Sequence, residues 1–143
     1  MMIEQNHFST LIKSYLEIHF SEFIPTLKFQ SDGSFDCILR NPTNLFSIWI
    51  ATYNSEITLG IEDPSGKTDI HTHISCYEES EISETLSDLS IMINDIKNNK
   101  TVLYCKDESS FQWTNNISSI LKKNIHSKNI QFYCWKTGNT NYN

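Results

Sequence analysis

The chain has 143 residues, of which 38% are hydrophobic and 12% aromatic, so it is long enough to bury a core without metal or disulfide staples. This composition excludes a disordered or fibrous protein. The net charge is −6 and Arg40 is the only arginine, so the surface has few groups that could follow a phosphate backbone. We therefore expect no nucleic-acid partner. We also expect no membrane partner, because no apolar run reaches the length of a membrane span.

The first predicted element is a helix with one buried face. Apolar residues recur at helical spacing from Phe8 to Phe23, and Pro25 stops the pattern. His19 lies on this apolar stripe, so we expect it to be a packed core histidine and not a ligand.

Four predicted strands follow the helix. Apolar and polar residues alternate over residues 29–39, and residues 45–53 form a dense apolar and aromatic run that is typical of a central strand. Residues 56–62 alternate again, residues 63–66 predict a turn, and residues 69–77 complete the series. The four strands predict an antiparallel meander with one covered face.

A second helix is predicted from an N-cap at Ser80 to the pair Asn98 and Asn99. The remaining predictions, in chain order, are a strand at residues 101–106, an aromatic segment at 111–113, a short helix carrying Ile117, Ile120, Leu121 and Ile125, and a strand at 130–135. The predicted fold class is therefore α+β, with one antiparallel sheet of five to six strands packed against two or three helices. Residues 1–136 form a single domain, and residues 137–143 form a polar C-terminal tail.

The four cysteines are Cys37, Cys76, Cys105 and Cys134, and none belongs to a C-x-x-C pair. Each lies in a segment that is predicted to be a strand, where a thiol behaves as a small apolar side chain. We expect reduced core thiols and a cytoplasmic location, because the N-terminal residues also lack the basic region of a secretory signal.

One cluster has the residue types of a metal site. Asp69, His71 and His73 alternate along one strand, so their side chains project from one face, and a carboxylate with two imidazoles is a ligand set for zinc or iron. Three residues in line cannot easily surround one ion, so a further ligand such as Glu56, Glu62 or Glu78 would have to join. The alternative, which we favour, is the polar outer face of an antiparallel strand. We accordingly expect no cofactor.

Five acidic residues are concentrated at the start of the second helix: Glu78, Glu79, Glu81, Glu84 and Asp88. One interpretation is structural, since negative charge is favourable near a helix N-terminus. The other is a docking surface for a basic protein, because complementary charge accelerates association.

The segment from Glu56 to Ile74, a hairpin that ends in a His-x-His strand and precedes an acidic amphipathic helix, resembles a group of small bacterial α+β proteins of the toxin-immunity type. The resemblance covers residues 45–97. It implies a cytoplasmic immunity protein, as found in toxin systems that include contact-dependent inhibition, which binds and neutralises a cognate toxin. It carries over no catalytic residues.

Three functions stay open on the sequence. The first is an immunity protein that masks a basic toxin, such as a nuclease, through Glu78 to Asp88, with an exposed aromatic as anchor. The second is a secretion-type chaperone that binds an extended segment of an effector. The third is a small metal-dependent enzyme that uses Asp69, His71 and His73. We favour the first, which is not an enzyme.

Overall fold

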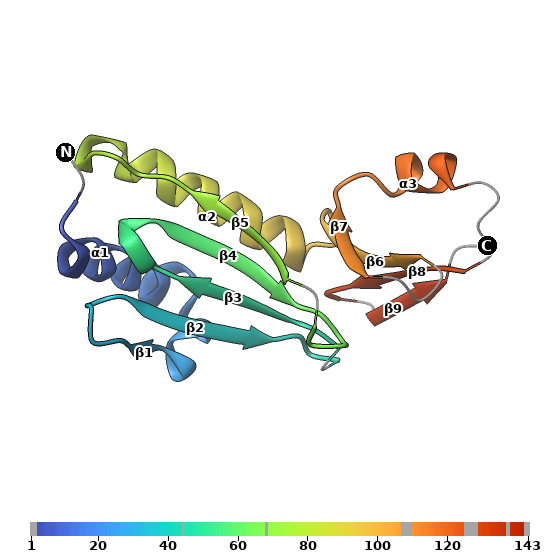
Figure 1. Cartoon of the computed structure of the whole chain (residues 1–143), viewed down its shortest axis with the longest axis horizontal. Coiled ribbons are helices and arrows are strands. Elements are labelled where there is room, and N and C mark those ends of the chain that lie inside the picture. Colours follow the sequence, from blue (N-terminus) through green and yellow to red (C-terminus); the bar gives the residue numbers. More distant parts are fainter. Residues whose placement is uncertain are drawn as a thin grey trace. The chain divides into compact units, whose positions relative to one another are not determined.

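The computed structural model describes residues 3–43, 45–67, 69–106, 110–124 and 129–136, together with the backbone of residues 138–141 (Figure 1). The fold is α+β, as the sequence predicts. The helices are α1 (Gln5–His19), α2 (Ile82–Lys97) and α3 (Ile117–Lys123), and the 3₁₀ turns are η1 (Ser21–Thr26), η2 (Tyr53–Ser55) and η3 (Glu79–Glu81). The strands are β1 (Lys28–Phe29), β2 (Phe35–Arg40), β3 (Ser47–Ala51), β4 (Ile57–Glu62), β5 (Asp69–Ile74), β6 (Val102–Lys106), β7 (Phe111–Thr114), β8 (Ile130–Cys134) and β9 (Gly138–Asn141).

The strands belong to two sheets, where the sequence predicts one. The first sheet has the order β1-β2-β3-β4-β5 and confirms the antiparallel meander. The second has the order β7-β6-β8-β9, and each neighbouring pair is antiparallel. The strands after α2 pair with one another because short connections favour local antiparallel partners, and the alternation of a single strand carries no information about which sheet it joins.

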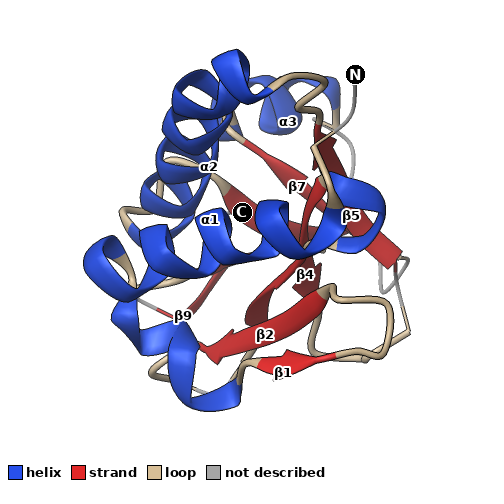
Figure 2. Ribbon diagram, turned by 90° about the vertical axis from the view of Figure 1, so that its left-hand side faces the viewer, coloured by secondary structure: helices blue, strands red, loops and turns tan. Residues whose placement is uncertain are grey.

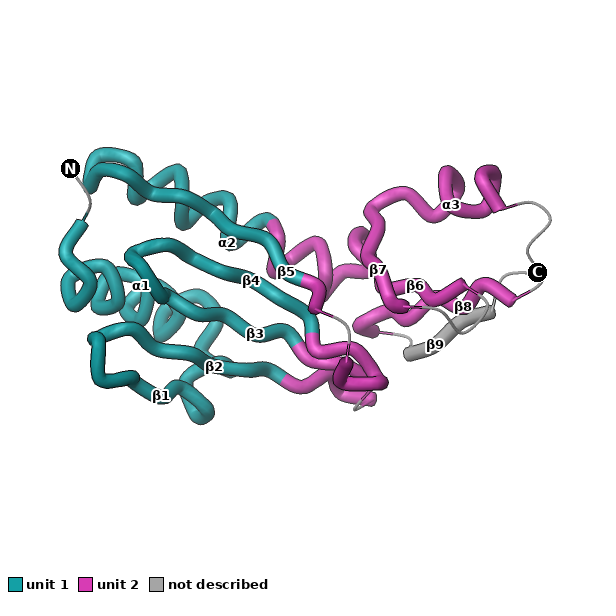
Figure 3. Tube along the Cα trace, viewed as in Figure 1, with its two compact units in different colours: residues 1–39, 48–61, 71–91 teal, residues 40–47, 62–70, 92–143 magenta. Residues whose placement is uncertain are grey.

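The chain falls into two compact units, and each is assembled from separate stretches of sequence (Figure 3). Unit 1 contains residues 1–39, 48–61 and 71–91, and unit 2 contains residues 40–47, 62–70 and 92–143. Neither unit can therefore be removed by a single cut in the chain. The single domain expected from the length stays a prediction.

In unit 1 the helices α1 and α2 lie on the same side of the first sheet (Figure 2). The strands alternate accordingly, with one face buried. The buried side chains include Ile57, Leu59 and Ile61 of β4 and Phe8, Ile12 and Leu16 of α1. We call the other side of this sheet the open face, and it carries Trp49, Glu56, Thr58, His71 and His73, none of which is buried.

A buried threonine links α1 to the sheet. The hydroxyl oxygen of Thr52 lies 3.0 Å from that of Ser9 and accepts the backbone N–H of Phe35 at 2.9 Å. Its carbonyl oxygen accepts the side-chain amide of Gln5 at 2.8 Å. Because Thr52 is fully buried, these bonds satisfy polar groups that would otherwise be costly to remove from water.

Unit 2 has its own apolar cluster. Its buried members are Val102, Ile130, Phe132 and Cys134, and Tyr104, Ile117, Ile120 and Leu121 pack against them from β6 and α3. Nearby in the same unit, the Asn41 side-chain amide donates to the carbonyl of Trp135 at 2.7 Å, and Trp135 packs edge-to-face on Phe46. Of the residues predicted for the short third helix, Ile125 lies outside the described residues.

Two predictions about the first helix are wrong. The α-helix ends at His19, because Phe20 leaves helical geometry, and Pro25 lies inside the following 3₁₀ turn. This change of path buries both Phe20 and Phe23. His19 is exposed and packs against the ring of Tyr15, so it is not a core histidine.

The segment predicted as a polar tail also contributes to the fold. Residues 138–141 form strand β9, which pairs with β8 in the register Phe132 to Thr140. An edge strand is held by backbone hydrogen bonds, so it does not need the apolar side chains on which the sequence prediction depended.

Candidate functional site

The acidic segment starts with two residues that cap a helix. Glu78 and Glu81 form a reciprocal capping box at η3, the turn that leads into α2. The Glu81 carboxylate accepts the backbone N–H groups of Tyr77 at 3.0 Å and of Glu78 at 2.9 Å. The N-cap is therefore Glu78, whereas the sequence predicts Ser80. The extra 3₁₀ turn moves the start of the helical segment upstream. These two carboxylates have a structural role.

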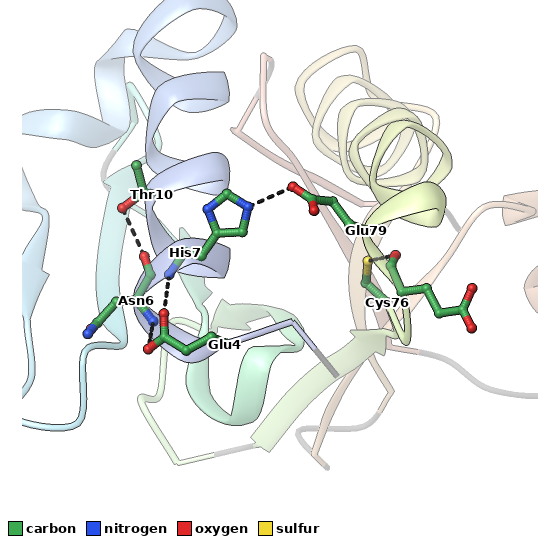
Figure 4. A network of polar contacts seen from close by, with 7 residues as sticks. Glu4, Asn6, His7, Thr10, Cys76 and Glu79 are labelled. Atoms are coloured by element: carbon green, nitrogen blue, oxygen red, sulfur yellow. Dashed lines mark hydrogen bonds and ion pairs between the residues drawn. The ribbon is translucent and has the colours of Figure 1, made fainter. Parts of the chain in front are cut away.

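The third acidic residue pairs with a histidine of α1. The Glu79 carboxylate lies 2.7 Å from Nε2 of His7, and both side chains are about half exposed or more (Figure 4). His7 belongs to the first turn of α1, where the Glu4 side chain accepts the backbone N–H groups of Asn6 and His7. These two N–H donors, Asn6 first, lower the pKa of the Glu4 carboxyl group. The contact between His7 and Glu79 thus joins the first turn of α1 to η3.

The last two acidic residues are free for a partner. Glu84 and Asp88 are exposed on α2, and their spacing places both on one face of the helix. Within the described part of the chain, no hydrogen bond or ion pair joins either carboxylate to another residue. Tyr77, just before the capping box, is 67% exposed, and Ile91 on α2 is 56% exposed. These two exposed side chains are available to anchor a partner by apolar contact.

The two histidines of β5 lie together on the open face of the first sheet. The ring centroids of His71 and His73 are 5.0 Å apart and the rings are nearly perpendicular. The His73 Nδ1 atom lies 2.9 Å from the Glu56 carboxylate and 3.0 Å from the Thr58 hydroxyl. The Ser75 hydroxyl donates to the other Glu56 oxygen at 3.3 Å. Glu56, immediately before β4, therefore contacts His73 of β5 and Ser75, the residue that follows β5.

An aromatic side chain extends this row toward the centre of the sheet. The Trp49 ring centroid lies 6.3 Å from that of His71. A Cβ atom at Gly60 would lie 2.2 Å from two atoms of the indole, so the ring occupies the space above this glycine. The absence of a side chain at Gly60 is thus what lets Trp49 lie against the sheet.

The three-residue metal site is not assembled. Among the residues that the structure describes, no group of three histidine, cysteine, aspartate or glutamate side chains is placed to hold a metal ion. Asp69 is on β5 with His71 and His73, but the carboxylate that reaches His73 comes from Glu56, immediately before the strand β4. Residues of one face of a single strand are spaced too far apart in a line to converge on one ion.

Sequence reasoning found the two histidines and named Glu56 among the carboxylates that could join them, but it missed Thr58 and Trp49. Alternation puts Glu56, Thr58 and Gly60 on one face of β4, yet it does not say which β5 residue lies beside each. The position of Trp49 over Gly60 had a weaker signal, namely a glycine in the middle of an otherwise regular strand.

A scan of the sequence against protein-family models finds no match, and searches among curated proteins and among solved structures find none. The resemblance to toxin-immunity proteins is thus neither supported nor refuted by these comparisons. No helix in the described ranges combines the length and the apolar character that crossing a membrane requires.

Proposed function

We propose that this protein is an immunity protein, which binds a cognate basic toxin in the cytoplasm and neutralises it by covering its active surface. The observation that carries the proposal is the exposure of Glu84 and Asp88, whose carboxylates make no hydrogen bond or ion pair within the described residues. The net charge of −6 favours a basic partner, since opposite charge raises the rate of encounter.

The contact surface of this proposal is narrower than the whole acidic segment. Glu78 and Glu81 are occupied by the helix cap, and Glu79 is paired with His7. Glu84 and Asp88 supply the charge, and Tyr77 supplies the aromatic anchor, because buried tyrosines carry a large share of the binding energy in protein interfaces.

The partner is identified with the full chain, tagged and retained on a column. We expect one stoichiometric basic protein from cells of the native host, bound at low salt and released at high salt, because a charge-dominated contact is screened by ions. Expression of that protein alone should arrest growth, and co-expression of this chain should restore it. A captured protein that is harmless, or whose toxicity persists on co-expression, would refute the proposal.

Charge reversal then locates the surface. Glu84→Lys and Asp88→Lys should each slow association with the purified partner about tenfold at low salt, and the difference should shrink at high salt. Glu17→Lys is the matched control, since it makes the same charge change at an exposed site on α1 and gives up only an exposed ion pair with Lys13. Equal slowing by the control would mean that only the total charge matters.

A further inference from the structure

The open face holds two imidazoles that are close enough to share a ligand. His71 and His73 are both exposed, and the His73 side chain retains 51% of its accessible surface. Imidazole nitrogens suit zinc, copper and nickel, and exposure leaves an ion free to reach them. The question is whether their orientation and spacing fit one ion.

The orientation of His73 is set by Glu56. An ionised carboxylate only accepts hydrogen bonds, so the 2.9 Å contact with Nδ1 requires the ring proton of neutral His73 to be on that atom. The Nε2 atom then carries the free lone pair. A carboxylate that holds the second nitrogen of a histidine in this way is the usual support of a metal-binding imidazole.

The spacing of the two rings also fits. A zinc–nitrogen bond is about 2.0–2.1 Å long, so an ion lies about 3.2 Å from the centre of each imidazole that binds it. At a tetrahedral angle, two such rings have their centres about 5.2 Å apart. The observed separation of His71 and His73 is 5.0 Å. This separation permits one nitrogen of each ring to bind a common ion.

We propose that His71 and His73 bind one transition-metal ion, with zinc as the representative, and that Glu56 orients His73 from behind. The ion takes two nitrogens from the protein and keeps water in its remaining positions. This two-histidine site differs from the Asp69, His71 and His73 set, since Asp69 is no ligand and the carboxylate acts through a histidine. It does not depend on the proposed immunity function.

The test is a calorimetric titration of the full chain with zinc chloride. We expect saturable binding of one ion per chain, with a Kd below about 1 mM, and a loss of at least about tenfold in His71→Ala and in His73→Ala. The matched control is His7→Ala. His7 bonds a carboxylate at 2.7 Å as His73 does, yet no ring contact joins it to another described histidine, so its removal should leave binding unchanged.

Glu56→Gln tests the orienting role separately. Outer-shell partners of metal ligands are typically worth a factor of 10–100 in affinity, so we expect at least about tenfold weaker binding. Nitrogen NMR of the free protein should show the proton of His73 on Nδ1, and this preference should weaken in the variant. Absence of saturable binding, equal affinity in His73→Ala, or loss in His7→Ala would each overturn the site. An unchanged affinity in Glu56→Gln would overturn the role of Glu56.

Discussion

Gly60 and Trp49 show how one residue constrains the open face. Gly60 lies in the middle of β4, where glycine is less favourable than a residue with a side chain to pack. The indole of Trp49 fills the space that such a side chain would need. The pair is therefore one unit of packing, and its members should not tolerate substitution independently.

We expect Gly60→Ala to lower the free energy of unfolding by about 1–3 kcal/mol, because the new methyl group displaces the indole. In a Trp49→Ala background the obstacle is gone, so Gly60→Ala should be neutral or stabilise by up to about 1 kcal/mol. Urea unfolding of the four proteins of this double-mutant cycle measures the coupling. The same loss in both backgrounds would show that Trp49 is not the obstacle.

The elements themselves follow closely from the pattern of the sequence. The alternation of residues 56–62 and 69–77 predicts strands, and β4 and β5 confirm them, although β5 ends at Ile74. The turn between them is also confirmed, since the Asp63 side chain accepts the backbone N–H groups of Ser65 and Gly66, and Gly66 has a φ of 69°. Such local signals are readable because they depend on residues close together in the chain.

What the sequence does not predict depends on relations between elements. The contact of Glu56 with His73 requires the register of two strands, and the contacts of Thr52 with Ser9 and Gln5 require a helix to dock at one point of the sheet. A threonine at the end of a strand looks the same in the sequence whether or not a helix covers it. Only its burial distinguishes the two cases.

At α2, the acidic residues separate into structural and free groups. The Glu81 carboxylate accepts two backbone N–H groups, whereas Glu84 makes no hydrogen bond or ion pair within the described residues. Glu81→Ala should therefore destabilise the protein by about 1 kcal/mol, as the loss of a helix cap does. Glu84→Ala, which removes the same charge, should stay within about 0.5 kcal/mol of the unsubstituted protein. Chemical denaturation checks this, and equal effects would argue against the capping role.

At the scale of the whole molecule, the four cysteines are divided between the two units. None of the four forms a disulfide and all are buried, as the sequence predicts for core thiols. Cys37 and Cys76 belong to unit 1, and Cys105 and Cys134 belong to unit 2. Burial, with a contribution from the charge of Asp36, raises the pKa of the Cys37 thiol to about 12. At pH 8 this thiol is protonated in the folded protein and unreactive, because the thiolate is the nucleophile.

These thiols can test whether the two units unfold as one domain. The helix α2 and the strands β2 to β5 each contribute residues to both units, so unfolding one unit must disrupt elements of the other. We expect all four cysteines to become reactive over one urea transition at pH 8, measured by brief alkylation and mass spectrometry of each cysteine peptide. Labelling rates of the fully unfolded chain correct for chemical differences between the sites. Two transitions, with Cys37 and Cys76 separated from Cys105 and Cys134, would instead mean that the chain folds as two domains. The helix and strands that the units share would then unfold in two separate parts.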